Sequence, residues 1–149
     1  MSNELIINST QNGCRIALVK DRKLVEFHQE TDGNQFNVGD IYMGSVKKVV
    51  QGLNAAFVDI GYEKDAFLHY LDLGPQVQSL NKFTKLVQTR KHTSSKLTGF
   101  KHEPDINKFG KIGQVLTKNQ KILVQVVKEP ISTKGPRLSC ELSIAGRYL

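Results

Sequence analysis

A block of short strand-like runs interrupted by glycines constrains the fold of this chain more than any other feature. The block extends from Gly39 to Leu73 and contains four glycines, each well placed for a bend or turn between short strands. Because side chains alternate between the two faces of a strand, the run 55–60 puts Ala56, Val58 and Ile60 on one face. Short, curved strands of this type favour a small β-barrel.

The number of such strands matches a five-stranded oligonucleotide-binding (OB) fold. Three strands are expected in the block just described, and two more over residues 122–127 and 137–142. Between the third and fourth, residues 74–111 are polar and lack a firm period. We expect a long, partly disordered insertion there, with at most a weak helix over 79–88. The predicted fold class is mainly β, with a barrel over residues 38–142 that contains this insertion.

The N-terminal residues 1–37 predict a separate small sheet. Strand-like runs occur at 4–8, 14–19 and 23–27, and the last two are joined by a turn at 20–22. A two- or three-stranded sheet of this size is marginal alone, so we expect it to need a partner layer.

The positive charge of the chain is concentrated in one segment. Lys and Arg number 21 against 14 Asp and Glu. Between Asn81 and Lys121 there are ten basic and two acidic residues, a local balance of +8, so the rest of the chain sums to −1. A basic segment indicates a polyanionic partner, and charge alone does not separate RNA from DNA, heparin or anionic lipid.

Cysteine usage and hydropathy narrow the cellular setting. Cys14 and Cys140 are too few and too far apart for a disulfide framework, which favours a reducing compartment. The sequence has no signal-peptide pattern at its start and no run of about 18 apolar residues. We expect a soluble, cytoplasmic protein without membrane contact.

Two phenylalanines fall on strand faces that should point outward. Phe57 alternates with Val58, and Phe67 alternates with Ala66 and Leu68, which take the core side. Outward aromatic rings on successive strands of a basic protein are typical of a surface that stacks single-stranded nucleic acid. The alternative is that either ring packs under the insertion or against the N-terminal sheet.

Basic residues are expected around these rings. An OB fold binds its ligand with the second and third strands and with the loops that join the first to the second and the fourth to the fifth strand. The latter loop, residues 131–136, carries Lys134, a cation suited to phosphate contact. Lys47, Lys48 and Lys64 flank the same region.

Tyr42 and His69 each have two interpretations. Tyr42, on the first barrel strand, either extends the aromatic surface or closes one end of the barrel. His69 shares the outward face with Phe67 and either contacts nucleic acid or is a solvated strand residue.

No catalytic centre is predicted. Asp59, Asp65 and Asp72 come from a strand, a turn and a strand exit, so they should not converge on metal ions as phosphoryl chemistry requires. Cys140 alternates with Leu138 and Leu142, which favours a buried structural thiol. We expect neither catalytic residues nor a cofactor in this chain.

The string GSVKKVVQGLNAAFVDIGYEKDAFLH (residues 44–69) resembles the S1 RNA-binding domain, a five-stranded barrel. The longer block from Asp40 to His69, together with ELIINST (4–10) and KILVQVVKEPISTKGPRLSCELSIAGRYL (121–149), resembles the N-terminal part of the bacterial ribonuclease E/G family. The run VQVVKEPISTKGPRL is closer to the ribonuclease G branch, through Arg137 after the Lys134-Gly135 pair. The insertion 74–111 is outside this resemblance.

The resemblance implies an endoribonuclease that cuts single-stranded RNA in RNA processing and decay. It implies that residues 1–37 are one piece of a discontinuous RNase H-like subdomain, that the S1 barrel contacts RNA through Phe57, Phe67 and Lys134, and that residues 143–149 begin a 5′-sensor region with Gly146 in its pocket. The family's magnesium and zinc ligands lie in later domains. We therefore expect an inactive, monomeric piece that works with the remainder of the nuclease chain, in a parent that forms a homo-oligomer.

Two other functions stay open at this point. The first is a free-standing S1 module of the translation machinery, which binds RNA without a nuclease. The second is a protein-docking barrel in which the two phenylalanines anchor a partner protein.

Overall fold

The chain folds into two compact units, residues 1–35 and 36–149. The computed structural model describes residues 2–31 and 35–146. The first unit is an antiparallel sheet of three strands in the order β1-β2-β3, which confirms the predicted small sheet. Its strands are β1 (Asn3–Thr10), β2 (Gly13–Lys20) and β3 (Lys23–Thr31). Asp21 and Arg22, at the two-residue turn between β2 and β3, both have positive φ, 49° and 64°, as a tight hairpin requires.

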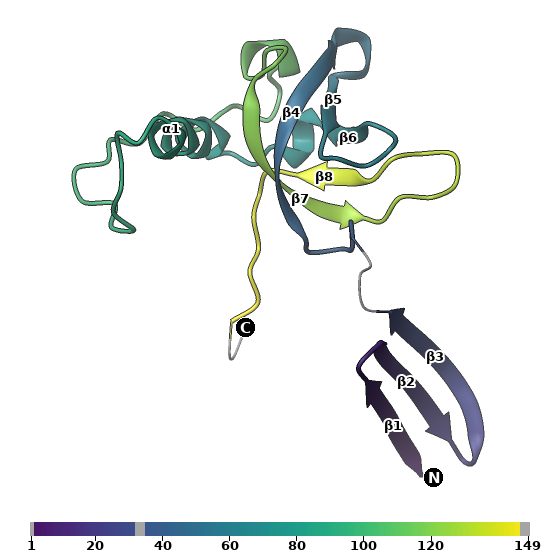
Figure 1. Cartoon of the computed structure of the whole chain (residues 1–149). Helices are drawn as coiled ribbons and strands as arrows, with labels where there is room; N and C mark the ends of the chain where they lie inside the picture. The colour runs from purple at the N-terminus through teal and green to yellow at the C-terminus, as the bar shows by residue number, and fades with distance from the viewer. Residues whose placement is uncertain (1, 32–34, 147–149) are drawn as a thin grey trace. The chain divides into compact units, whose positions relative to one another are not determined.

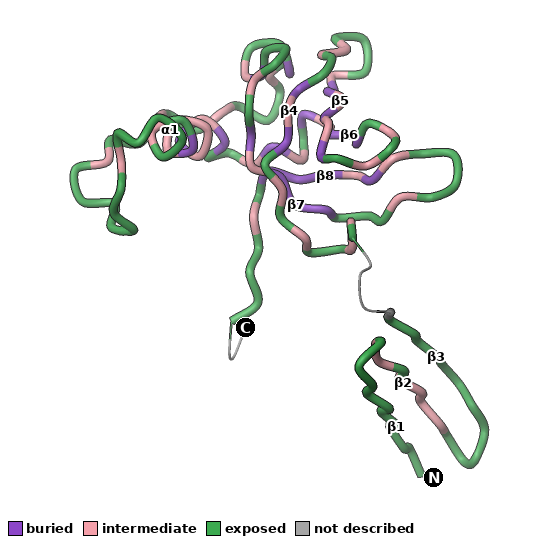
Figure 2. Tube along the Cα trace, in the orientation of Figure 1, coloured by how far each residue is buried: buried purple, intermediate pink, exposed green. Residues whose placement is uncertain are grey.

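None of the described side chains of this sheet is buried. Figure 2 shows only exposed and intermediate residues along β1 to β3. Leu5 and Phe27 are 62% and 53% exposed. A sheet that leaves such residues in water lacks a second layer on its own.

The second unit is a closed barrel in the order β4-β5-β6-β8-β7, which confirms the predicted five-stranded fold (Figure 1). The strands are β4 (Ile41–Val50), β5 (Ala55–Asp59), β6 (Ala66–His69), β7 (Lys121–Lys128) and β8 (Arg137–Ser139). Three short 3₁₀ helices connect them: η1 (Gln51–Leu53), η2 (Tyr70–Asp72) and η3 (Ile112–Gln114).

The barrel interior is filled by alternate side chains of all five strands. Val46, Val58, Leu68, Val124 and Leu138 are fully buried. Gly44 lies where the barrel is narrow, because a Cβ added there would come within 2.5 Å of Cγ1 of Val58. The predicted inward set of β5 and β6 is confirmed.

The seam between β6 and β8 closes the barrel with few contacts. The two strands are parallel and are paired only at Phe67 and Arg137, and the Phe67 backbone N–H donates to the carbonyl of Pro136 at 2.8 Å. The seam therefore passes directly beside one of the two outward phenylalanines.

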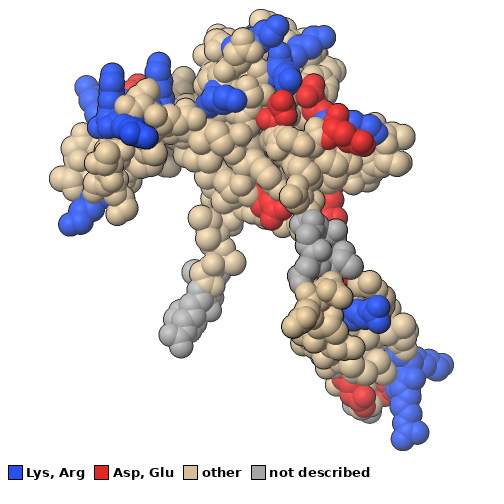
Figure 3. Space-filling model, viewed as in Figure 1, with Lys and Arg blue, Asp and Glu red and all other residues tan. Residues whose placement is uncertain are grey.

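The insertion between β6 and β7 is more ordered than expected. Instead of a weak helix, a 12-residue helix α1 (Val77–Gln88) packs against β7. Its buried face includes Ser79 and Thr84 beside Val77, so polar residues interrupt the apolar period of the helix. The Ser79 hydroxyl is hydrogen-bonded to the Glu103 backbone, whereas the buried Thr84 hydroxyl has no hydrogen-bond partner among the described residues. Figure 3 shows Lys and Arg side chains gathered over this part of the molecule.

The return of the insertion is tied to its start and to the barrel. The Ile106 N–H donates to the carbonyl of Pro75 at 2.9 Å. The Asn54 side chain accepts from the Ile112 N–H at 2.7 Å and donates to the Gly110 carbonyl at 3.1 Å. These hydrogen bonds explain why the insertion is ordered, although its sequence predicted little regular structure.

Candidate nucleic-acid interface

Phe57 on β5 and Phe67 on β6 form an aromatic pair on the outer face of the barrel. They are direct partners in the antiparallel register. Their ring centroids are 5.8 Å apart with 68° between the planes, an edge-to-face arrangement. Each ring is partly exposed, whereas the residues alternating with them, such as Val58 and Leu68, are fully buried. The structure thus places both rings where alternation predicted.

A cavity of about 870 Å³ lies over this aromatic pair and is bordered by the loop between β7 and β8. Its charged lining comprises the cations Lys64, Lys128, Lys134 and Arg137 and the carboxylates Asp65 and Glu129. The cavity therefore combines two aromatic rings with an excess of positive charge.

The loop 131–136 is held against the turn between β5 and β6. Ile131 and Lys134 exchange backbone hydrogen bonds of 3.1 and 3.0 Å, which makes the loop a small hairpin. The Lys64 ammonium donates to the Ser132 carbonyl, and a Cβ on Gly135 would collide with the Asp65 carbonyl. The backbone of the loop is fixed by these contacts, and the Lys134 side chain remains exposed.

Lys47 and Lys48 lie next to the aromatic pair on β4, at an irregularity in the ladder. Lys48 pairs with Phe57 in register, after a shift between Val46 and Lys48. The Lys47 ammonium lies 3.3 Å from Oδ2 of Asp59. The Gly61 N–H and then Lys47 lower the pKa of the Asp59 carboxyl from its usual range. Lys47 is therefore partly neutralised, whereas Lys48 has no ion-pair partner among the described residues.

Tyr42 occupies the second of its two predicted positions, at one end of the barrel. It packs against the core cluster, and its ring stacks on Phe36 at 5.3 Å with 17° between the planes. Its hydroxyl accepts from the Phe36 N–H at 2.9 Å and lies 3.2 Å from Oδ2 of Asp40. These contacts place Tyr42 with Phe36 rather than with the aromatic pair of β5 and β6.

His69 lies at the end of β6, on the same side as Phe67. Their ring centroids are 6.4 Å apart. Nδ1 of His69 accepts from the Leu71 N–H at 3.1 Å and caps η2. In the neutral ring this contact leaves Nε2 as an N–H donor.

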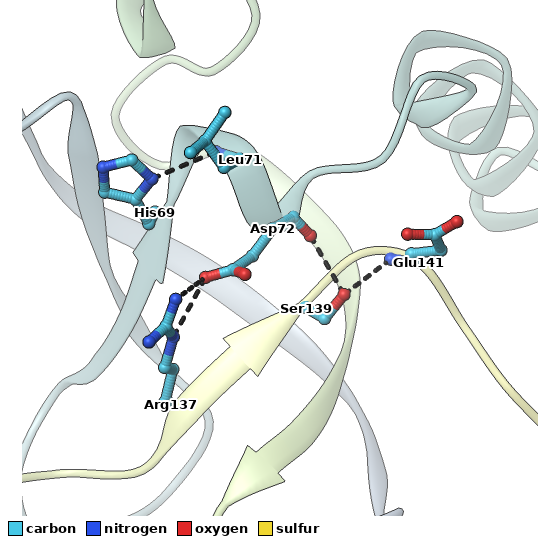
Figure 4. Close-up of polar contacts among 6 residues, drawn as sticks. All are labelled: His69, Leu71, Asp72, Arg137, Ser139 and Glu141. Carbon is cyan, nitrogen blue, oxygen red and sulfur yellow. Dashed lines mark hydrogen bonds and ion pairs between the residues drawn. The ribbon is translucent and has the colours of Figure 1, made fainter. Parts of the chain in front are cut away.

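A polar clamp between η2 and β8 supports the seam beside Phe67 (Figure 4). Nε and Nη2 of Arg137 donate to Oδ2 of Asp72 at 3.0 and 2.8 Å. The Asp72 carbonyl accepts from Oγ of Ser139 at 3.0 Å and from the Cys140 N–H at 2.9 Å. No local sequence pattern predicts this clamp, because Asp72 and Arg137 are 65 residues apart in the chain.

The described residues contain no group of three or more His, Cys, Asp or Glu side chains that would hold a metal ion. Asp72 pairs with Arg137 and Asp59 with Lys47, as shown above. The Cys140 thiol is buried, as predicted, and burial, with a smaller contribution from the Asp72 charge, raises its pKa to about 12. A thiol with such a pKa is a poor nucleophile at neutral pH.

Gly146 lies beyond β8 and is exposed. The segment before it is attached to β7, because the Gln125 side chain accepts from the Ser143 N–H at 2.8 Å and donates to the Ser143 carbonyl at 2.7 Å. No feature of this segment tests the predicted 5′-sensor role of Gly146, which stays a prediction.

Among the described residues, no helix is both long and apolar enough to cross a membrane.

Comparison with known proteins confirms the resemblance found in the sequence. The family model for the S1 RNA-binding domain matches residues 35–141. Ribonuclease G of Haemophilus influenzae is 37% identical over 146 residues, which cover 98% of this chain and 26% of that protein. Ribonuclease G of Escherichia coli K12 is 34% identical over 149 residues, covering 100% and 27% of the two chains.

A third relative comes from outside ribonuclease G itself. The ribonuclease E/G-like protein of Porphyra purpurea is 34% identical over 151 residues, covering 100% of this chain and 23% of that protein. The chain spans about a quarter of the length of the curated relatives it matches.

Proposed function

Because the chain belongs to the S1 RNA-binding domain family, we propose that it binds single-stranded RNA by stacking bases on Phe57 and Phe67. The observation that carries this proposal is the pair itself: two partly exposed rings, in register on adjacent strands and 5.8 Å apart. Every base offers a planar face to such a ring, so the contact tolerates many sequences.

Cations around the pair would contact the phosphates. Lys134 is exposed on a loop of fixed backbone, and Lys48 is exposed beside Phe57, which supports this role for both. Lys47 and Lys64 already bind Asp59 and the Ser132 carbonyl and would contribute less. His69 would donate from Nε2, and Tyr42 would act indirectly by supporting the barrel end.

At the level of the whole protein, we infer the RNA-holding part of a ribonuclease G-like endoribonuclease of RNA processing and decay. The inference rests on identity to ribonuclease G over nearly the whole chain. The described residues do not fit the magnesium or zinc sites implied for such an enzyme, because no suitable group of ligands lies together. In this proposal the chain positions cytoplasmic RNA, and other residues of the enzyme cut it.

The test is binding of a fluorescently labelled, A/U-rich single-stranded RNA, measured by anisotropy at two salt concentrations. Phe57→Ala or Phe67→Ala should each weaken binding roughly five- to 150-fold, since stacking contributes ~1–3 kcal/mol per base. Phe27→Ala is the matched control, because Phe27 is an exposed phenylalanine of the other unit. Affinity that neither barrel variant changes would remove the stacking surface.

A lysine variant tests the electrostatic half. Lys134→Ala should lower the slope of log K against log salt by about 0.7, the loss of one phosphate contact in single strands. Lys23→Ala, in the N-terminal sheet, should leave that slope unchanged. A protein-docking barrel predicts instead that the wild-type chain binds no RNA at either salt concentration.

A further inference from the structure

The insertion carries a second ring array that the barrel site does not use. Rings of His92, Phe83, Phe100 and His102 follow one another with centroid separations of 5.1, 5.6 and 5.2 Å. Phe83 belongs to α1 and the other three rings to the return segment after it. The His102 ring is exposed and the other three are partly exposed. The array is therefore accessible to a ligand with planar groups.

An apolar groove of about 620 Å³ runs along this array. Phe83, Phe100 and His102 line one part of it, and Pro75 and Leu142 line another. None of its lining residues belongs to the cavity over Phe57 and Phe67. The groove is thus a separate feature of the same folded unit.

Positive charge predominates around the groove, although Glu141 is among its lining residues. Between Val77 and His102 there are six Lys or Arg residues and no Asp or Glu. Lys82 contacts Glu103 at 2.6 Å and lies 5.6 Å from the centre of the Phe100 ring. The other five cations are exposed: Lys85, Arg90, Lys91, Lys96 and Lys101. We call these six cations and four rings the insertion patch. Figure 3 shows Lys and Arg side chains gathered over the part of the molecule that contains α1.

A purely structural role explains only part of the insertion patch. Edge-to-face contacts between Phe83 and Phe100 would stabilise the return segment whatever its charge. Lys101 lies close enough to Glu103 to help lower the pKa of that carboxyl. The other four exposed cations have no ion-pair partner among the described residues, and they do not help that packing, since like charges repel. They do form the electrostatic complement of a polyanion.

From these observations we propose that the insertion patch is a second contact surface for single-stranded RNA, which extends the path of a strand held at Phe57 and Phe67. The occupant is RNA rather than an acidic protein because exposed rings interleaved with cations match the alternation of bases and phosphates. The proposal rests on the proposed function for the identity of the ligand. It assigns a role to the insertion that the barrel strands do not provide.

RNA length distinguishes the two surfaces, because a strand must be long enough to reach both. One OB fold covers roughly 4–16 nucleotides, so we compare oligouridylates of about 6 and about 30 nucleotides. The test variant combines Lys85→Gln, Lys91→Gln and Lys101→Gln, which removes three exposed cations. The control combines Arg15→Gln, Lys20→Gln and Lys23→Gln, exposed residues of the N-terminal sheet, with the same loss of charge.

The insertion variant should bind the long RNA on the order of tenfold more weakly near 0.1 M salt, with a salt slope lower by about 2. Its affinity for the short RNA should equal that of the control. Phe100→Ala should weaken long-RNA binding and leave the salt slope unchanged, because it removes a ring and no charge.

Failure of this proposal differs from failure of the barrel site. Equal long-RNA affinities for the insertion variant and the control, at both salt concentrations, would overturn the second surface whatever Phe57→Ala does. If the insertion variant loses as much affinity for a duplex of the same length as for the single strand, the assignment to single-stranded RNA is overturned. Unchanged short-RNA binding by Phe57→Ala and Phe67→Ala would overturn the barrel site alone.

Discussion

The N-terminal sheet and the barrel use similar strands, but their apolar side chains have different surroundings. On β1, Leu5, Ile6 and Ile7 are 62%, 53% and 59% exposed. On β6 and β7 of the barrel, Leu68 and Val124 have no exposed surface. Three strands cannot close on themselves, whereas five strands with one seam can enclose a core. An alternating strand pattern is therefore enough to form a sheet, but it is the closure of the strands into a barrel that buries apolar side chains in a core.

The role of the sheet as a piece of a larger layered subdomain stays a prediction, and the exposed faces of the sheet bear on it. Apolar residues at consecutive positions such as Ile6 and Ile7 point to opposite faces of β1. A sheet that is apolar on both faces is typical of the middle layer of an α/β domain. Its RNase H-like identity stays a prediction.

The same truncation should have very different effects in the two units. Leu68→Ala should lower the free energy of unfolding of the barrel by ~2–5 kcal/mol, because it leaves a cavity in the core. Leu5→Ala should leave barrel stability within about 0.5 kcal/mol of wild type. Urea unfolding followed by tyrosine fluorescence measures this, because all four tyrosines lie outside residues 1–35. Equal midpoint shifts for both variants would show that the sheet and the barrel unfold as one unit.

The elements that could be predicted from sequence are those that a local period determines. The strands, the inward positions of β5 and β6 and the outward Phe57 and Phe67 all follow from a period of two. Cys140 is buried as predicted, but it follows the end of β8 and its neighbour Ser139 is buried too, so alternation does not explain its burial. Helix α1 was underestimated because its buried face includes Ser79, whose hydroxyl accepts from the Glu103 N–H at 2.8 Å. A contact 24 residues away leaves no local signal.

The polar contacts of the site were the least predictable part. Asp72 was expected at a strand exit, but its pairing with Arg137 of β8 across the seam was not predicted. Tyr42 had two possible positions because a residue near a strand end can point either into the barrel mouth or outward, and only the neighbouring Phe36 decides. Register between distant strands determines the Asp72 contact, and a single sequence does not encode that register locally.

Ion pairs offer a second, smaller contrast between the units. Asp72→Asn removes the charge that Arg137 contacts at the seam, where the carboxylate side chain is only 23% exposed. We expect a loss of ~1 kcal/mol in barrel stability, less than for a fully buried pair because the Arg137 side chain is partly solvated. The loss should shrink at high salt.

The matched control is Glu26→Gln in the N-terminal sheet. Glu26 contacts Nε2 of His28 at 2.6 Å, but the two side chains are 57% and 63% exposed. Exposed pairs contribute little to stability, so this variant should unfold like wild type in urea. An Asp72→Asn variant that also unfolds like wild type would show that backbone contacts alone hold the seam.

The two cysteines give the smallest contrast, which concerns the dependence of stability on pH. It is absent at neutral pH and grows at alkaline pH. Cys14 on β2 is partly exposed, and Cys140 is buried with a pKa of about 12, above the ordinary 9.0. The folded barrel thus binds the Cys140 proton more tightly than the unfolded chain does. The resulting stability is fully present below pH 9 and is lost as the pH rises from about 9 towards about 12.

Thiol labelling and alkaline unfolding together test this prediction. At pH 8 a disulfide reagent should label Cys14 first, and Cys140 should react only as the barrel opens. Cys14→Ser should remove the fast phase and leave the alkaline loss of stability intact, whereas Cys140→Ala should diminish that loss. Rapid labelling of both thiols in the native protein would contradict the buried position of Cys140, and with it the closed seam that Asp72 and Arg137 support.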